Sequence, residues 1–178
     1  MKRSLPINKF SQGGPPSPVV LATCIDREGN SNIITLGMFM SISIDPYQVC
    51  IGVSPKRYSH DLIMEQKEFA INVPGIELVD EMHKCGVISG KDNNKWDETG
   101  LTPIPAQKIA PTLIKECYGH LECRVIQHIT CGDHTLFIGE VVAASAEEEV
   151  LVENNLVLSK AMPIIQKNWD YHTVKKQK

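Results

Sequence analysis

The sequence predicts a mainly β protein in which antiparallel strands close into a barrel with short flanking helices. About six or seven short β-rich stretches follow one another at close spacing and are separated by turn residues. The repeated strand–helix–strand order that builds a parallel sheet is missing. Closure also removes the exposed sheet edges that promote aggregation. With 178 residues, of which 42% are hydrophobic, the chain suits a single domain over 1–178.

The N-terminal half holds three predicted strands and two predicted helices. Turn residues separate the first two strands, and Asp45-Pro46 ends the second. One helix has Ser59 or His60 as its expected N-cap and passes into a β-type run, and the other carries Gly86 as its expected C-cap. The predicted bounds are 19–26, 32–44 and 48–54 for the strands and 77–86 for the second helix.

The C-terminal half is dominated by a long loop and a predicted hairpin. The loop, 89–113, is rich in Gly, Asn, Asp and Pro, and long loops inside a compact domain often carry function. We therefore expect a ligand beside it. Alternating stretches at 120–129 and 135–148 follow, with Gly132 and Asp133 between them as the turn.

Charge and hydropathy argue against several kinds of partner. A formal net charge of −3 and a pI near 6.1 provide no basic field for a nucleic-acid backbone. No apolar run is long enough to span a bilayer, and no apolar segment of signal-peptide length follows the basic N-terminus. We expect a cytoplasmic protein without nucleic-acid or membrane partners.

The six cysteines are expected to be reduced thiols, because disulfide frameworks belong to small secreted chains. Cys85, at the end of a predicted helix, and Cys131, in a turn near His134, could each be activated by an imidazole. Whether either cysteine takes part in redox chemistry stays open. The sequence contains no GxSxG, HExxH, P-loop or Rossmann motif, so no side chain is assigned as catalytic.

The segment HITCGDHTLFIG raises the question of a metal site. His128, Cys131 and His134 recur in it at three-residue spacing. On a strand, residues three apart point to opposite faces, so His128 and Cys131 would not share one ion. The chain also lacks the Cys-x2-Cys pairs of structural zinc sites. The sequence therefore favours a hairpin turn over a metal centre.

Groups suited to a phosphate and a flat ring occur at strand ends and in the long loop. Gly37 would let a ring approach the backbone, and nearby hydroxyls could donate to phosphate oxygens. Arg57 beside a helix N-terminus suits an anion. Each residue taken alone is better explained as a solvated turn or a capping residue. The candidates are Asn32, Thr35, Gly37, Ser41, Arg57, Ser59, His60, Ser89, Gly90, Lys91, Lys95 and Trp96.

An ordered set of motifs covers nearly the whole chain. It runs from SNIITLGMFMSISIDP through RYSHDLI, EFAINVP, CGVISGKDNNKW and DETGLTP to LECRV and GDHTLFIGEV. Together these motifs resemble the flavin reductase-like family, the FMN-binding split barrels that include flavoredoxins and archaeal flavin-dependent ferric reductases. The resemblance implies a closed split β-barrel of Greek-key type, a homodimer, and FMN rather than FAD as cofactor.

The resemblance also implies roles for particular residues. Arg57 and Ser59 match the segment that holds the flavin phosphate, and Lys95 matches a loop lysine near the flavin. His134 and Trp169 are candidates for contact with a second substrate, and Tyr171 is a further residue that could cover the site. The implied cofactor contacts are Asn32, Thr35, Leu36, Gly37, Met38, Ser41, Arg57, Ser59, His60, Ser89, Lys95 and Trp96.

The implied function is that of an FMN-dependent oxidoreductase that takes hydride from NADH or NADPH and passes electrons to flavin, ferric chelate or another acceptor. The expected role of Lys95 is to stabilise negative charge on the reduced ring. An alternative is a flavoredoxin-like carrier that exchanges electrons with a protein partner without using a nicotinamide directly. A metal- or thiol-dependent protein is a third interpretation.

Overall fold

Seven antiparallel strands form the main sheet of the protein. The structure is a computed structural model and describes residues 2–6, 9, 13–168 and 170–175. The hydrogen-bonded order is β3-β2-β6-β9-β10-β5-β4, and every pairing within it is antiparallel. Its strands are β2 (Val20–Ile25), β3 (Ser31–Leu36), β4 (Phe39–Ile44), β5 (Tyr47–Val53), β6 (Glu68–Val73), β9 (Gly119–Cys131) and β10 (His134–Ala146).

The two edge strands of this sheet are consecutive in the chain. Only Gly37 and Met38 separate β3 from β4, although the two strands end the hydrogen-bonded order on opposite sides. Because neighbouring Cα atoms are about 3.8 Å apart, Leu36 and Phe39 lie within about 11 Å of each other. The sheet must therefore curl until its edges meet end to end. Pairing between β3 and β4 is not among the ladders of the described residues, so full closure stays a prediction.

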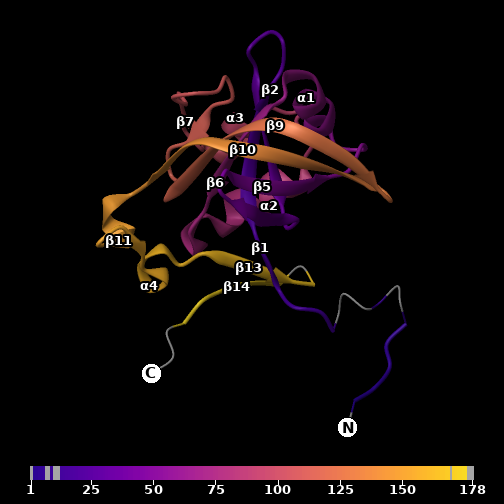
Figure 1. The fold of residues 1–178 in the computed structure, drawn as a ribbon, viewed down its shortest axis with the longest axis vertical. Coiled ribbons are helices and arrows are strands. Elements are labelled where there is room, and N and C mark those ends of the chain that lie inside the picture. Colours follow the sequence, from indigo (N-terminus) through magenta and orange to yellow (C-terminus); the bar gives the residue numbers. More distant parts are fainter. Residues whose placement is uncertain (1, 7–8, 10–12, 169, 176–178) are drawn as a thin grey trace.

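The predicted strand over 32–44 is wrong as one element, because the chain turns at Gly37–Met38 into a second strand. The predicted hairpin is confirmed. Cys131 pairs with His134 around a two-residue turn in which Gly132 has a φ of 60°, a conformation that favours glycine. Two register shifts along β9 and β10 bend this ribbon, which curves across the sheet in Figure 1.

Short helices flank the sheet. The expected helix caps are wrong. Arg57, not Ser59 or His60, is the N-cap of α1, which begins at Tyr58. Gly86 lies inside α2, and Ile88 is its C-cap. The long loop 89–113 holds a helical turn, α3, and two short strands that sequence periodicity did not indicate. The helices are α1 (Tyr58–Gln66), α2 (Val79–Val87), α3 (Lys95–Thr99) and α4 (Leu158–Ala161), and the 3-10 turns are η2 (Ile76–Leu78) and η3 (Glu148–Val150).

A second, three-stranded sheet brings the C-terminal segment back to the start of the domain. It has the order β1-β13-β14 and lies below the main sheet in Figure 1. Its strands are β1 (Ser17–Pro18), β13 (Ile164–Lys167) and β14 (Asp170–Thr173), and the remaining short strands are β7 (Pro103–Ile104), β8 (Leu113–Ile114), β11 (Leu151–Val152) and β12 (Asn155–Leu156).

The core consists of two main clusters on the two faces of β2. Phe69 and Phe137 belong to the cluster beside α1, whereas Met82 and Ile164 belong to the cluster beside α2. All of these side chains are essentially inaccessible to solvent. Strand β3, which pairs with β2, is thereby held between two packed layers, and its polar residues have fixed positions. Among the described residues, no helix is both long and apolar enough to cross a membrane.

Candidate functional site

A cavity of about 750 Å³ opens beside β3, where the sequence placed most of its candidates. Its walls come from β3, the end of β5, the start of α1, α2 with the following loop, the tip of the β9–β10 hairpin, and the second sheet. This volume lies in the range of small-molecule and cofactor sites. The predicted residues that line it are Asn32, Thr35, Leu36, Gly37, Met38, Arg57, Ser59, Ser89, Gly90, Lys95, His134 and Tyr171.

Polar groups at the floor of the cavity are fixed by buried hydrogen bonds. The Asn32 side chain donates to Ser59 Oγ over 2.7 Å, and both residues are buried. Thr35 Oγ1 donates to the Met82 carbonyl over 2.5 Å, which attaches β3 to α2. Because these groups are already oriented, a ligand would meet a preorganised surface.

The start of α1 gives the cavity a cationic side. Arg57 is the N-cap of α1 and makes no side-chain cap hydrogen bond, and Lys56 precedes it in the cavity wall. The positive end of the helix dipole adds to these charges. Of the side chains that line the cavity, Lys56, Arg57 and Lys95 are cationic and only Asp133 is a carboxylate. The cavity therefore suits an anionic ligand.

Lys95 is the most informative residue of the site. Its side chain is 5% exposed, and its Nζ donates to the Cys85 carbonyl over 2.6 Å. Among the described residues, no carboxylate forms an ion pair with it. Burial lowers the pKa of the Lys95 ammonium. A buried cation without an anionic partner is costly, so this position favours a ligand that carries negative charge.

Glycines make room for close backbone approach at the cavity wall. A Cβ at Gly37 would collide with the side-chain amide of Gln166, which reaches over from β13. A Cβ at Gly86 would lie 3.3 Å from the Cβ of Thr35, tighter than an ordinary contact. The absence of a side chain at Gly86 lets α2 pack closely against β3, and at Gly37 it leaves room for the Gln166 side chain. Approach of a flat ring to the Gly37 backbone stays a prediction.

One side of the cavity is formed by a pair that local sequence patterns do not indicate. His83 Nδ1 on α2 and Tyr171 Oη on β14 are 3.0 Å apart, and the two rings meet edge to face with centroids separated by 5.8 Å. Burial raises the pKa of Tyr171, so the phenol stays protonated at neutral pH. The sequence analysis named Tyr171 as a residue that could cover the site. It did not name His83 for this site, because no local pattern marks a residue whose partner lies 88 positions further along the chain.

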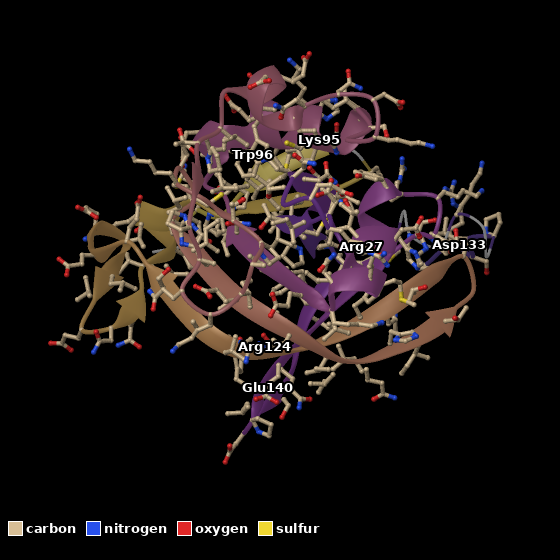
Figure 2. The ribbon with its side chains drawn as sticks, turned by 90° about the horizontal axis from the view of Figure 1, so that it is seen from above. Arg27, Lys95, Trp96, Arg124, Asp133 and Glu140 are labelled. Carbon is tan, nitrogen blue, oxygen red and sulfur yellow. The ribbon has the colours of Figure 1, made fainter. Side chains whose placement is uncertain are left out.

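The tip of the β9–β10 hairpin contributes a second polar pair. His134 Nδ1 and Asp133 Oδ1 are 2.7 Å apart, and this hydrogen bond lowers the pKa of Asp133. Figure 2 shows Asp133 at the tip of the ribbon and Lys95 on a separate element, and both residues line the cavity. Among the described residues, no group of three or more His, Cys, Asp or Glu side chains could hold a metal ion.

Three predicted contacts fall outside the lining of this cavity. His60 Nε2 faces Thr135 Oγ1 at 3.0 Å, and Ser41 Oγ faces Tyr47 Oη at 2.7 Å. Trp96 donates from Nε1 to the Ser31 carbonyl over 2.9 Å and lines an adjacent cavity instead. Trp169 lies outside the described residues.

Cys85 lines the cavity as a protonated thiol. Burial raises its pKa to about 11, and only the thiolate is an effective nucleophile. Cys131 is exposed on the hairpin. Sequence reasoning missed lining residues on β1, β3, the end of β5, the segment that leads into α1 and its first residue, α2 with the following residue, and β13. They are Ser17, Ile34, Gly52, Val53, Ser54, Lys56, Tyr58, His83, Val87, Ile88 and Gln166.

Comparison with known proteins identifies the class. The family model described as "Flavin reductase like domain" matches residues 13–166, and the chain belongs to this family. An uncharacterised protein of Archaeoglobus fulgidus is 39% identical over 111 residues, which cover 62% of this chain and 63% of that protein. An NADH:riboflavin 5'-phosphate oxidoreductase of Streptomyces pristinaespiralis is 27% identical over 131 residues, covering 71% and 69%.

Solved structures agree with this assignment. The flavoredoxin of Methanosarcina acetivorans is 28% identical, with a TM-score of 0.87 over 100% of this chain and 94% of that chain. The flavoredoxin of Desulfovibrio vulgaris (Miyazaki F) is 26% identical, with a TM-score of 0.88 over 99% and 95%. A putative flavin reductase with a split-barrel domain from Shewanella frigidimarina shares the fold at 19% identity, with a TM-score of 0.87 over 98% and 92%.

Proposed function

We propose that the cavity beside β3 binds FMN and that the protein is a flavin-dependent oxidoreductase. The observation that carries this proposal is Lys95, a buried ammonium in a cavity that holds three cations and one carboxylate. Bound there, FMN would supply the redox chemistry, accepting hydride from a nicotinamide and passing electrons to an acceptor. The family and the named Streptomyces relative support the same class of reaction.

The chain would bind the flavin through two kinds of contact. Lys56 and Arg57, at the positive end of α1, suit the phosphate, and the buried Asn32–Ser59 pair orients polar groups beside it. The turn at Gly37–Met38 presents backbone to a flat ring. Lys95 would place its charge where negative charge develops on reduction, which favours the reduced state.

We also infer a homodimer. Edge strand β4 exposes Met40, Ile42 and Ile44, with 90% of Ile44 accessible, and the β9 residues Ile126 and Ile129 are also exposed. An exposed edge with apolar side chains is an aggregation hazard unless another chain covers it. Met38, which lines the cavity, directly precedes this strand, so the partner subunit would lie next to the flavin.

We further propose a cytoplasmic location. All six cysteines are free thiols in the structure, which suits a reducing compartment. The expected partners of the chain are then a nicotinamide or reduced redox protein as donor and a second copy of the same chain.

Anaerobic stopped-flow mixing tests the reaction. The FMN-loaded protein is mixed with NADH or NADPH, and loss of the oxidised flavin absorbance is followed. Rapid bleaching by either nicotinamide supports the reductase. No bleaching by nicotinamides, together with bleaching by a reduced redox protein, supports the carrier that the flavoredoxin neighbours represent. A protein that does not take up FMN at all refutes the proposal.

A further inference from the structure

His83 and Tyr171 form a hydrogen-bonding pair at one side of the cavity, and the proposed flavin contacts use neither residue. Tyr171 lies directly opposite Gln166 in the β13–β14 ladder, so these two side chains share one face of the second sheet. The Gln166 amide in turn occupies the space beside Gly37. Strand pairing therefore places the Tyr171 phenol close to the turn at which the flat ring is proposed to lie.

Helix α2 brings His83 to the same part of the cavity. Gly86 follows His83 by three positions, so both residues lie on one side of the helix. A Cβ on Gly86 would lie 3.3 Å from the Cβ of Thr35, which shows how closely this side of α2 approaches β3. The contact between His83 and Tyr171 therefore joins two elements that both meet β3 near its end.

The wall around this pair is neutral and partly apolar. Among the described residues, the lining side chains from β1, α2, β13 and β14 include no Lys, Arg, Asp or Glu. Met38 and Val87 also line the cavity, and 53% and 61% of their surfaces are exposed. A highly charged ligand would instead find its counter-charges at Lys56 and Arg57. The wall thus suits an uncharged molecule with an apolar body and an oxygen that accepts a hydrogen bond.

The pair can deliver a proton as well as a hydrogen bond. Burial raises the pKa of Tyr171, so the phenol carries its proton at neutral pH. His83 Nδ1 lies 3.0 Å from Tyr171 Oη, and His83 is exposed to solvent. A protonated imidazole donates from both ring nitrogens, so Nδ1 can donate to the phenol oxygen while the phenol donates into the cavity. A proton given up by Tyr171 can therefore be replaced from solvent through His83.

We propose that Tyr171 donates a proton to the carbonyl oxygen of a neutral α,β-unsaturated ketone or aldehyde, and that the protein reduces the carbon–carbon double bond of this compound. A conjugated carbonyl compound fits the wall because it is uncharged and flat and carries one accepting oxygen. The inference rests on the proposed flavin function, since the bound cofactor supplies the hydride.

The electrons and protons of this step balance. Hydride adds to the β-carbon, the π electron pair of the double bond moves toward the carbonyl group, and the carbonyl oxygen takes the Tyr171 proton to give an enol. His83 Nδ1 returns a proton to Tyr171 and regains one from water. The enol then isomerises to the saturated carbonyl compound. The nicotinamide loses the two electrons that the unsaturated compound gains.

Equilibrium binding tests the site without turnover. The probe is 3-methylcyclohex-2-enone, whose β-methyl group slows the addition of thiols, and it is added to oxidised FMN-loaded protein, which has no hydride to transfer. The change in flavin absorbance gives the dissociation constant of the enone. Tyr171→Phe should raise this constant about threefold to tenfold, the effect of one lost hydrogen bond. Tyr118→Phe, the same substitution outside the cavity, should leave it unchanged.

Single-turnover kinetics separate hydrogen bonding from proton transfer. His83→Asn keeps a polar group near the position of Nδ1 but cannot carry a proton. The rate of enone reduction is divided by the rate with hexacyanoferrate(III), which accepts electrons without a proton, so that general damage to the site cancels. This ratio should fall about 100-fold in both His83→Asn and Tyr171→Phe. The enone dissociation constant should hold in His83→Asn, and both quantities should hold in Tyr118→Phe.

Three results would overturn the proposal while the flavin function stands. The first is an unaltered protein that takes up FMN but neither binds nor reduces the enone. The second is an unchanged rate ratio in both Tyr171→Phe and His83→Asn, since the pair would then only join α2 to β14. The third is an equal change of the dissociation constant in Tyr171→Phe and Tyr118→Phe. Failure of the unaltered protein to bind FMN would instead refute the flavin function itself.

Discussion

Replacement of Lys95 by methionine is the sharpest test of how the cavity holds its ligand. Methionine keeps an unbranched apolar side chain, one heavy atom shorter than lysine, but removes the charge that is buried next to the Cys85 carbonyl. A charge-assisted interaction in a buried setting contributes about 1.5–3 kcal/mol, so FMN should dissociate about 10- to 150-fold more readily. Quenching of flavin fluorescence on titration into the apoprotein measures this change.

The pH dependence gives Lys95 a signature that loss of packing would not produce. Burial lowers the pKa of Lys95 in the free protein, and a bound anion raises it again. FMN binding should therefore be tight at neutral pH and weaken as alkaline pH deprotonates Lys95, at a lower pH than an ordinary lysine requires. The Lys95→Met protein should lack this loss. An equal dependence in both proteins, or an unchanged affinity in Lys95→Met, would show that Lys95 does not face the ligand.

Three further predictions concern the walls and the surface. Gly37→Ala places a methyl group against Gln166 and should weaken FMN binding by roughly tenfold. Gly100→Ala, at a positive-φ turn position that lines neither cavity, controls for loss of stability, and equal FMN affinities in the Gly37→Ala and unaltered proteins would argue against close approach at Gly37. Ile44→Lys, on the exposed edge of β4, should shift the dimer to monomer in light scattering, whereas a monomeric unaltered protein would exclude the interface. Tyr171→Phe removes the hydroxyl next to His83 and should change the KM for the second substrate about threefold or more while FMN affinity holds; unchanged kinetics would make this pair structural.

Local sequence patterns predicted the parts of the fold that depend on neighbouring residues. The β9–β10 hairpin follows from alternating strands on either side of Gly132-Asp133. The existence of α1 follows from the change to helical spacing, although its N-cap is Arg57 and not the predicted Ser59 or His60. In contrast, the break at Gly37–Met38 is imposed by the curling of the sheet. Gly37 is a local signal for this break, but the stretches on either side have strong β propensity and so predict one continuous strand.

The candidate site was predictable only in part, for the same reason. Asn32, Arg57 and Lys95 belong to motifs whose order along the chain indicated the family resemblance. The structure brings these three residues to one cavity. His83 and Gln166 reach that cavity from elements whose proximity depends on tertiary packing of the second sheet. Trp96 shows the opposite case, since it follows Lys95 directly in sequence but faces the adjacent cavity.

The central claim is that the cavity beside β3 is a flavin site, and the stoichiometry of FMN binding tests it most directly. The apoprotein and its Arg57→Ala and Lys95→Met variants are titrated with FMN by calorimetry. We predict one FMN per chain in the unaltered protein and a larger dissociation constant, that is, weaker binding, in both variants. Absence of binding, or binding with the same constant in all three proteins, would contradict the account.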